Sequence, residues 1–413
     1  MKFVLLYLVL LSSRAFGFGD NGQVFIPLDD FPFTFAIEVF EEGDAYRSFW
    51  FPAHRAEGLM QARILEDGSP DTTFADQGVL RYKDRKGFEP FIVFKEADGE
   101  YLTVTNSKSA SYLSKIKADG KIDTSFGNNG FKLFSNVSRI HCATRDSSGR
   151  MVTVSSKGPS DRRSLAFERY LADGNLDTTF GRQGVLPVVA IAKISSPGCA
   201  GIVIKSDQTL VASLQTGSRD GRTLLVSALP DGKGLDSRFA RNGILDSDTV
   251  VPQGNPGDLK LGANDAILSF VHRSNPQSAG GHFDAYLFAV DANGRLISSF
   301  GDQGRIRFPQ SFTSKLAVDG EKKIYLARTE LRARAMKVYK FLPDGKPDLS
   351  FGDQGVGSIK PDAQGVPVSP DGVILDSLNR IVIYGTSVIR GLVFERLLPN
   401  GTADLGDDQS ASL

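Results

Sequence analysis

The stretch "DGNLDTTFGRQGVL" occupies residues 173–186, and close variants of it recur along the chain. "DGSPDTTFADQGVL" begins at Asp67, "DGKIDTSFGNNGF" at Asp119 and "DGKPDLSFGDQGV" at Asp344. The phenylalanine of this motif recurs every 51 to 61 residues, as Phe18, Phe74, Phe126, Phe180, Phe239, Phe300 and Phe351. A period of this length indicates a repeat architecture in which each unit packs against the next.

The two ends of the chain each carry half of the motif. The second half, "FGDNGQV", begins at Phe18, and the first half, "PNGTAD", occupies residues 399–404. Joined, the two halves make one complete motif. We therefore predict seven units that close on themselves, with the break in the chain inside one unit.

Each unit reads as four strands. In the third unit, "SRIHCATR", "RMVTVSS" and "SLAFERYL" alternate apolar and polar residues and are separated by turn residues. Asp-Gly pairs favour tight hairpins, and no segment shows a helical period with caps. The prediction is an all-β, seven-bladed β-propeller of four-stranded antiparallel blades, whose closing blade is shared by the N- and C-terminal segments. Residues 18–413 would form this single domain.

The motif aspartates are predicted to be structural. Their carboxylates can accept hydrogen bonds from backbone N–H groups two or three residues on. They are Asp71, Asp123, Asp177, Asp236 and Asp348. The hydroxyls of Thr72, Thr124 and Thr178 are expected to act similarly, and the motif phenylalanine to fill the gap between blades. The fifth unit has Ile297 in place of the aspartate, which argues against a calcium ligand needed in every blade.

Residues 148–186, "SGRMVTVSS" through "LAFERYLADGNLDTTFGRQGVL", resemble the bacterial delta-60 repeat. The resemblance extends over residues 18–404, and the strand layout is also similar to that of NHL-type propeller units. The repeat units lack the sequence pairs that characterise WD-type repeats. The resemblance implies an exported bacterial propeller, and it implies no particular chemistry.

The first 17 residues have the features of a secretory signal peptide. Lys2 provides the charged start, residues 3–11 form an apolar run too short to span a bilayer, and Ala15 and Gly17 are small residues preceding a cut before Phe18. The alternative is a buried N-terminal strand. No later stretch is long and apolar enough for a membrane span. We expect export to the periplasm, the cell surface or the medium.

The chain has two cysteines, Cys142 and Cys199. We expect two separate buried thiols. A disulfide is the alternative, because the protein is predicted to be exported and both residues fall in the first strands of consecutive units.

No catalytic constellation is evident in the sequence. The four histidines, His54, His141, His272 and His282, lie in neither a nucleophile elbow nor a metal-binding pattern. His54 and His272 are interpreted as loop residues between second and third strands. There is no phosphate-binding glycine loop and no cysteine cluster, so we predict no catalytic residue, metal or cofactor. The formal net charge is zero, which gives no support to nucleic-acid binding.

The clearest functional signal is an asymmetry of charge. On one face of the propeller we expect two kinds of turn, those that join first and second strands and those that join third and fourth strands. These turns are rich in acidic residues. These are Glu41, Glu42, Asp44, Glu66, Asp67, Asp98, Asp119, Asp173, Asp231 and Asp344. The opposite face should collect the loops between second and third strands, which are rich in arginine. The candidate ligand-binding residues are Arg55, Arg163, Arg219, Arg222, Arg273, Arg332, Arg334 and Arg390.

From this asymmetry we predict a non-enzymatic, monomeric binding module for an anionic glycan, envelope polymer or protein. The alternative is a hydrolase or lyase with a site at the central channel. Ordinary solvated loop charge is the simplest explanation of the asymmetry and stays open.

Overall fold

The structure is a computed structural model of the chain. It describes residues 18–19, 22–26, 34–52, 59–82, 89–107, 110–134, 139–158, 164–188, 198–216, 221–274, 283–330, 335–358, 369–387 and 391–405. Within these residues the chain forms strands and two short 3-10 helices, η1 (Ser247–Thr249) and η2 (Ala263–Asp265).

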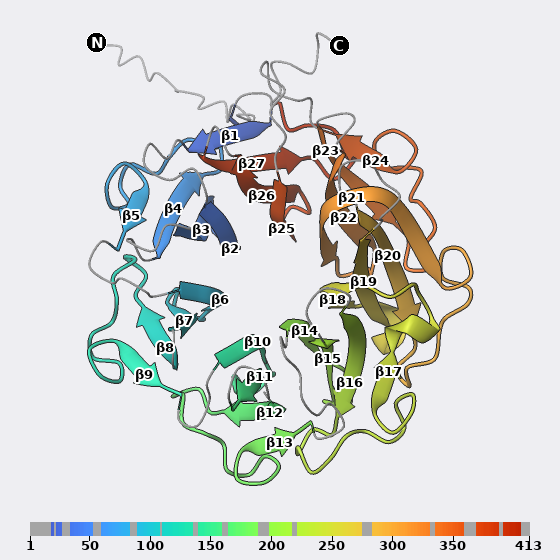
Figure 1. Ribbon diagram of the computed structural model, residues 1–413. Coiled ribbons are helices and arrows are strands. Elements are labelled where there is room, and N and C mark those ends of the chain that lie inside the picture. The colour runs from blue at the N-terminus through green and yellow to red at the C-terminus, as the bar shows by residue number, and fades with distance from the viewer. Residues whose placement is uncertain are drawn as a thin grey trace, which may run out of the picture.

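The strands form seven antiparallel blades around a central axis (Figure 1), numbered here in chain order. Blade 1 contains β2 (Thr34–Glu42), β3 (Ala45–Pro52), β4 (Met60–Leu65) and β5 (Val79–Arg81). Blade 2 contains β6 (Glu89–Lys95), β7 (Tyr101–Asn106), β8 (Ser111–Ile116) and β9 (Phe131–Leu133). Blade 3 contains β10 (Arg139–Arg145), β11 (Met151–Lys157), β12 (Ser164–Tyr170) and β13 (Val185–Pro187).

Blade 4 contains β14 (Gly198–Ile204), β15 (Leu210–Thr216), β16 (Arg222–Ala228) and β17 (Ile244–Asp246). Blade 5 contains β18 (Asn255–Leu261), β19 (Ile267–Ser274), β20 (Phe283–Val290) and the first part of β21 (Arg305–Val318). Blade 6 contains the second part of β21, β22 (Ile324–Glu330), β23 (Ala335–Phe341) and β24 (Val356–Ser358). Blade 7 contains β25 (Ser369–Leu375), β26 (Ile381–Ser387), β27 (Gly391–Leu397) and β1 (Gln23–Ile26).

The predicted seven-bladed all-β propeller is confirmed, with one variation. Strand β21 is both the outer strand of blade 5 and the inner strand of blade 6, so these two blades form one seven-stranded sheet. The other blades are separate four-stranded sheets.

The ring is closed by the two halves of the divided motif. β1 pairs antiparallel with β27, from Gln23 opposite Glu395 to Ile26 opposite Leu392. The backbone N–H of Phe18 donates to the carbonyl oxygen of Asp404 at 3.0 Å. The same bond occurs within an undivided motif, where the backbone N–H of Phe180 donates to the carbonyl oxygen of Asp177 at 3.1 Å. The predicted shared closing blade is therefore confirmed in its strand pairing and in its turn.

The motif aspartates accept the predicted backbone hydrogen bonds. Asp177 Oδ1 accepts the backbone N–H of Thr179 at 3.1 Å and its hydroxyl at 2.6 Å. The corresponding donors to the other motif aspartates are Thr73, Ser125, Arg238 and Ser350. The hydroxyls of Thr72, Thr124 and Thr178 were expected to accept backbone hydrogen bonds as the aspartates do. The hydroxyls that bond the carboxylates belong to the residues after them, Thr73, Ser125 and Thr179.

In four motifs the second carboxylate oxygen binds a cation that lies eight residues earlier on the third strand of the blade. Arg169 Nε donates to Asp177 at 2.7 Å, and Arg396 Nε donates to Asp404 at 2.7 Å. Arg63 pairs likewise with Asp71, and Lys340 with Asp348. In blade 5 the cation position is Ala289 and the aspartate position is Ile297, so both partners of the ion pair are replaced together.

Two of these cations, Arg396 and Arg169, also reach the neighbouring blade. The guanidinium of Arg396 donates to the carbonyl of Glu66 in blade 1 at 2.7 Å, and that of Arg169 donates to Pro230 in blade 4 at 2.8 Å. Both of these guanidiniums lie over a motif phenylalanine, at 4.4 Å for Arg396 and Phe18 and at 4.8 Å for Arg169 and Phe180. A single side chain thus binds the turn of its own blade, the hairpin of the next blade and the aromatic ring between them.

The structure joins Cys142 on β10 to Cys199 on β14 in a disulfide, with Cα atoms 5.6 Å apart. We had expected two separate buried thiols. The inner strands of consecutive blades are close enough at this level for the side chains to meet, which the spacing in the sequence could not determine.

We predict that deleting residues 18–28 lowers the melting temperature sharply, because the deletion removes Phe18 and β1 and leaves β27 as an unpaired strand edge. Deleting residues 406–413, which follow the closing motif, is the control and should change melting little. Thermal unfolding followed by circular dichroism measures both. A protein without residues 18–28 that melts like the control would contradict ring closure by this segment.

A second prediction concerns the cysteines. Titration with a thiol reagent should find no free thiol in the denatured, unreduced protein and two after reduction, because Cys142 and Cys199 are bonded to each other. Two free thiols before reduction would show that the bridge does not form in solution.

Candidate functional site

The structure describes two of the eight candidate arginines. Arg222 begins β16 and pairs with Asp246 and Asp248, the latter at 3.2 Å. Arg273 lies on β19 and is exposed. The other six lie outside the described residues: Arg55, Arg163, Arg219, Arg332, Arg334 and Arg390. Of the two described arginines of the proposed basic face, Arg222 already binds two carboxylates and Arg273 is exposed to solvent.

The acidic residues of the opposite face have a structural explanation. Six of the ten accept the backbone N–H of the residue two positions later, which is the bond that stabilises a tight turn. They are Asp67, Asp98, Asp119, Asp173, Asp231 and Asp344. Glu42 pairs with Arg47 at 3.1 Å, and Glu66 pairs with Arg380 at 2.6 Å. The acidity of this face therefore follows from its turns and blade contacts and needs no ligand.

The described inner strands surround the axis of the ring (Figure 1), and each has an irregularity near its start, or in β21 near the start of the part that belongs to blade 6. The pairing with the second strand shifts at Ala36/Glu38, Pro90/Ile92, Ile140/Cys142, Cys199/Gly201, Pro256/Leu259, Ser311/Ser314 and Pro370/Gly372. A bulge redirects side chains and is common beside functional sites. The inner wall at this level is therefore a candidate position for functional side chains.

Blades 1 and 7 contribute a buried acid and a phenol to this wall. Tyr384 on β26 donates its hydroxyl to Glu38 Oε1 on β2 at 2.9 Å. Tyr384 passes over the inner strand β25 at Gly372, where a Cβ atom would overlap the tyrosine ring. Glycine at this position therefore allows a second-strand side chain to reach the inner wall.

Blades 5 and 6, which precede blade 7 around the ring, contribute a second polar group. Asp258 on β18 accepts the backbone N–H of Leu316 at 2.7 Å and lies 3.9 Å from the Lys315 ammonium. His272 on β19 lies over the bulge of β18, where a Cβ on Gly257 would be 3.0 Å from His272 Nε2. We call Glu38, Asp258, His272, Lys315 and Tyr384 the channel cluster.

Burial sets the protonation of this cluster. It lowers the pKa of His272 to about 4, with Asp258 opposing this shift and Lys315 adding to it, so the imidazole is neutral at pH 7. It raises the pKa of Glu38 despite the hydrogen bond from Tyr384 and the charge of Lys260. The charge of Asp258 also acts on both Glu38 and Tyr384, which places the two halves of the cluster in one electrostatic environment.

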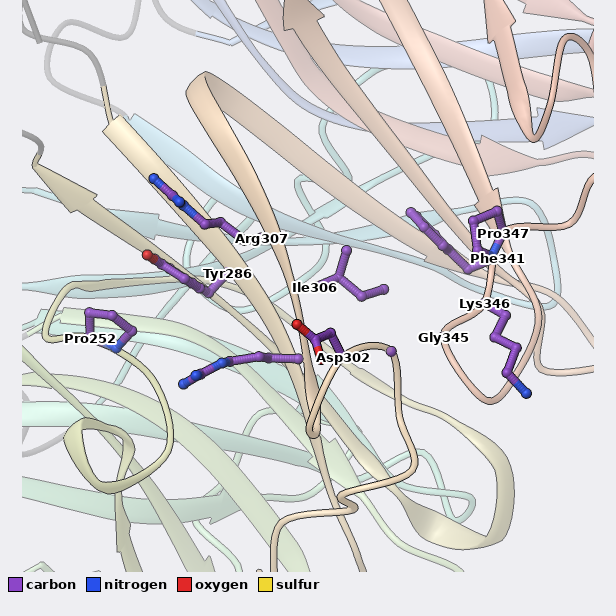
Figure 2. A pocket seen from close by; sticks show the side chains of 11 residues that line it. Pro252, Tyr286, Asp302, Ile306, Arg307, Phe341, Gly345, Lys346 and Pro347 are labelled. Carbon is purple, nitrogen blue, oxygen red and sulfur yellow. The ribbon is translucent and has the colours of Figure 1, made fainter.

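Two hollows lie elsewhere on these blades, and neither is lined by a residue of the channel cluster. The first, of about 440 Å³, is lined by the ends of β18, β21 and β25 and includes Lys260 and Lys322. The second, of about 640 Å³, is on the outer rim between β20, β21 and the hairpin of blade 6 (Figure 2). Figure 2 shows Arg307 and Lys346 on opposite sides of the rim hollow, pointing apart. Arg307 donates to Asp284 at 2.8 Å, so the cations there do not converge on a common ligand position.

Sequence reasoning missed most of the cluster. Glu38, Asp258 and Tyr384 carry no motif, and His272 had been interpreted as a loop residue, whereas it lies within β19 (Ile267–Ser274). His54 and His282 lie outside the described residues, and His141 bonds the Ser156 hydroxyl at 2.9 Å. The sequence signal that could have indicated the cluster was a glycine within an inner strand, at Gly257 and at Gly372.

The described part of the chain has no group of three or more His, Cys, Asp or Glu side chains arranged to hold a metal ion. It also contains no helix with the length and apolar character needed to cross a membrane.

Comparison with known proteins supports the fold alone. No family model and no curated protein matches the chain. A structure of an ulvan lyase from a polysaccharide lyase family, bound to -[GlcA(1-4)Rha3S]-, is similar over 96% of this chain and 97% of its own, with a TM-score of 0.51 and 9% identity. A streptogramin B lyase is similar over 91% and 97% of the two chains, with a TM-score of 0.48 and 11% identity.

The extracellular domain of a putative one-component system from B. thetaiotaomicron matches 95% of this chain and 43% of its own, with a TM-score of 0.48 and 9% identity. Identity this low shows a shared propeller fold and carries no chemistry. The resemblance to the delta-60 repeat stays a prediction.

We predict that His272 makes folding stability depend on pH. Its folded pKa lies below the value of 6.5 for an unperturbed histidine, so its contribution is present above pH 6.5 and is lost as the pH falls toward 4. His272→Phe keeps a ring beside Phe270 and cannot titrate. Between pH 7 and 4.5, wild type should lose up to about 3 kcal/mol more unfolding free energy than the variant, measured by urea denaturation. Parallel losses in the two proteins would contradict this assignment.

Proposed function

We propose that the protein is an exported, non-enzymatic propeller that binds an anionic glycan where its channel opens among the loops joining second and third strands. The observation that carries this proposal is the channel cluster. It combines Glu38 and Tyr384 from blades 1 and 7 with Asp258, His272 and Lys315 from blades 5 and 6.

The chemistry of the cluster suits a hydroxyl-bearing ligand. Sugar hydroxyls both donate and accept hydrogen bonds, and they need both kinds of partner at close range. The cluster offers carboxylates on Glu38 and Asp258, a phenol on Tyr384 and an ammonium on Lys315. The neutral imidazole of His272 adds a group that can either donate or accept. A purely apolar or purely cationic wall would not discriminate for hydroxyls in this way.

The basic loops supply the preference for negative charge. His272 and the exposed Arg273 lie near the end of β19 that leads into its loop, so the cluster is near the face to which the candidate arginines were assigned. Arginine binds carboxylate and sulfate groups through two parallel hydrogen bonds. Single exposed contacts are weak, and a repeating polymer that contacts several blades at once would combine them.

A second candidate function is catalysis at the same place, as a hydrolase or lyase. The raised pKa of Glu38 and the neutral imidazole of His272 are the properties of general acid and base groups. The proposed binder and the proposed enzyme share a site and differ in turnover.

The test is binding of the mature protein to anionic glycans and their uncharged counterparts, measured by calorimetry at 0.1 M and 1 M salt. Changing Arg219, Arg222, Arg332 and Arg334 to serine should weaken binding by about tenfold, because each exposed contact contributes a few tenths of a kcal/mol. High salt should weaken it too, since the Debye length falls from about 10 Å to about 3 Å. Arg307→Ser, on the outer rim, is the matched control and should bind like wild type.

Equal binding by the four-arginine variant, or binding that ignores salt, would remove the basic face from the proposal. If the protein prefers an acidic protein or an envelope fraction to every glycan tested, the ligand is not a glycan, and that partner takes its place in the proposal. New reducing ends or new double bonds in a bound glycan would establish the enzyme instead.

A further inference from the structure

The hollow of about 440 Å³ at the ends of three inner strands combines an apolar lining with two cations. We call it the lysine hollow, after Lys260 and Lys322. The other six described residues that line it are all apolar: Leu261, Ala317, Val318, Val373, Ile374 and Leu375. Its volume is within the range of pockets that bind small molecules.

The lysine hollow belongs to the inner wall of the ring. Lys260 and Leu261 end β18, Val318 ends β21 and Leu375 ends β25, which are inner strands of blades 5, 6 and 7. Inner strands are the strands nearest the axis (Figure 1), so a hollow shared by three of them lies on the axis side of these blades. It is further along β18 and β21 than the channel cluster, toward the turns that join first and second strands.

Both lysines present their charge to this space. Lys260 and Lys322 are exposed, and in the described part of the chain neither forms an ion pair with a carboxylate. Lys323, the residue after Lys322, does form one, with Glu321 at 2.8 Å. The cations of the lysine hollow therefore differ from the many paired cations of the blades, and they make the hollow complementary to negative charge.

The backbone of Lys322 is unusual for a lysine. Its φ is 67°, in the left-handed region that favours glycine. Its N–H donates to the Asp319 carbonyl at 3.0 Å, the turn bond that Gly99 and Gly149 make in blades 2 and 3. A lysine here costs backbone strain that glycine avoids, and strain of this kind is typical of positions whose side chain is used.

We propose that the lysine hollow binds a small organic anion with an apolar body, of the class of medium-chain alkyl carboxylates. Its carboxylate pairs with Lys260 and Lys322, and its hydrocarbon part packs on the apolar lining. A neutral alkyl ligand would leave both ammoniums unpaired, and an alkyl cation would be repelled by them. This site is separate from the proposed glycan site and does not depend on it.

The first experiment measures binding of three ligands with the same alkyl chain by calorimetry. Octanoate should bind, octan-1-ol should bind more weakly, and octylammonium should not bind. In the series from butanoate to octanoate, affinity should rise about fourfold for each added methylene, because each one is removed from water in the hollow.

The second experiment removes the two charges. Lys260→Gln combined with Lys322→Asn should weaken octanoate binding about fivefold, as expected for the loss of two exposed ion pairs. Asparagine suits position 322 because Asn379 has a φ of 59° in the β25–β26 turn. The matched control, Lys121→Gln with Lys346→Gln, removes two charges from the hairpins of blades 2 and 6 and should bind octanoate like wild type.

Bound octanoate should also slow acetylation of Lys260 and Lys322, and not of Lys121 and Lys346, in peptide mass spectra. Failure of octanoate to bind at millimolar concentration would overturn the proposal, as would equal binding of octylammonium or affinity that ignores chain length. Equal binding by the Lys260/Lys322 variant, or equal weakening in the control, would also overturn it, because the two lysines would then have no specific role.

Discussion

The contact on which the ring depends is the cation that bridges consecutive blades. Arg169 binds the motif aspartate of its own blade, the Pro230 carbonyl of the next blade and the face of Phe180. A buried guanidinium is costly unless all its partners are present, and here the partners belong to two blades. Neither Arg169 nor Arg396 is satisfied within its own blade, which ties blade 3 to blade 4 and blade 7 to blade 1.

Variation among the blades follows the same constraint. At the end of blade 5, Ala289 and Ile297 replace both members of the ion pair, which leaves no charge unpaired, and β21 instead continues as one strand into blade 6. In blade 4, where the third-strand position is Ser227, Lys205 from the inner strand lies 3.9 Å from Asp236 and donates to Ala292 in blade 5. In blade 4 the cation therefore comes from a different position in the chain. It still has the same two kinds of partner, a motif carboxylate and a backbone carbonyl of the next blade.

The sequence predicts the fold well because the motif is local. The aspartate, the hydroxyl and the phenylalanine of one turn lie within four residues, so the period and the divided ends indicate both the number of blades and the way in which they close. The candidate site is different, since Glu38 and Tyr384 are 346 residues apart and meet only when blades 1 and 7 are adjacent. The disulfide could not be decided from sequence for a related reason, since bulges in β10 and β14 set which residues face each other.

Stability and channel chemistry lie in different parts of each blade. The motif holds the outer strand and the hairpin, whereas the channel cluster combines inner-strand side chains with two second-strand side chains, Tyr384 and His272, that pass over glycines of the inner strand. Gly372 admits the Tyr384 ring, and Gly257 leaves room for His272. Because these glycines lie outside the bridging network, their replacement would displace channel side chains without removing any cation from its partners. A propeller of this kind can therefore change the groups on its inner wall while the interaction that closes the ring stays the same.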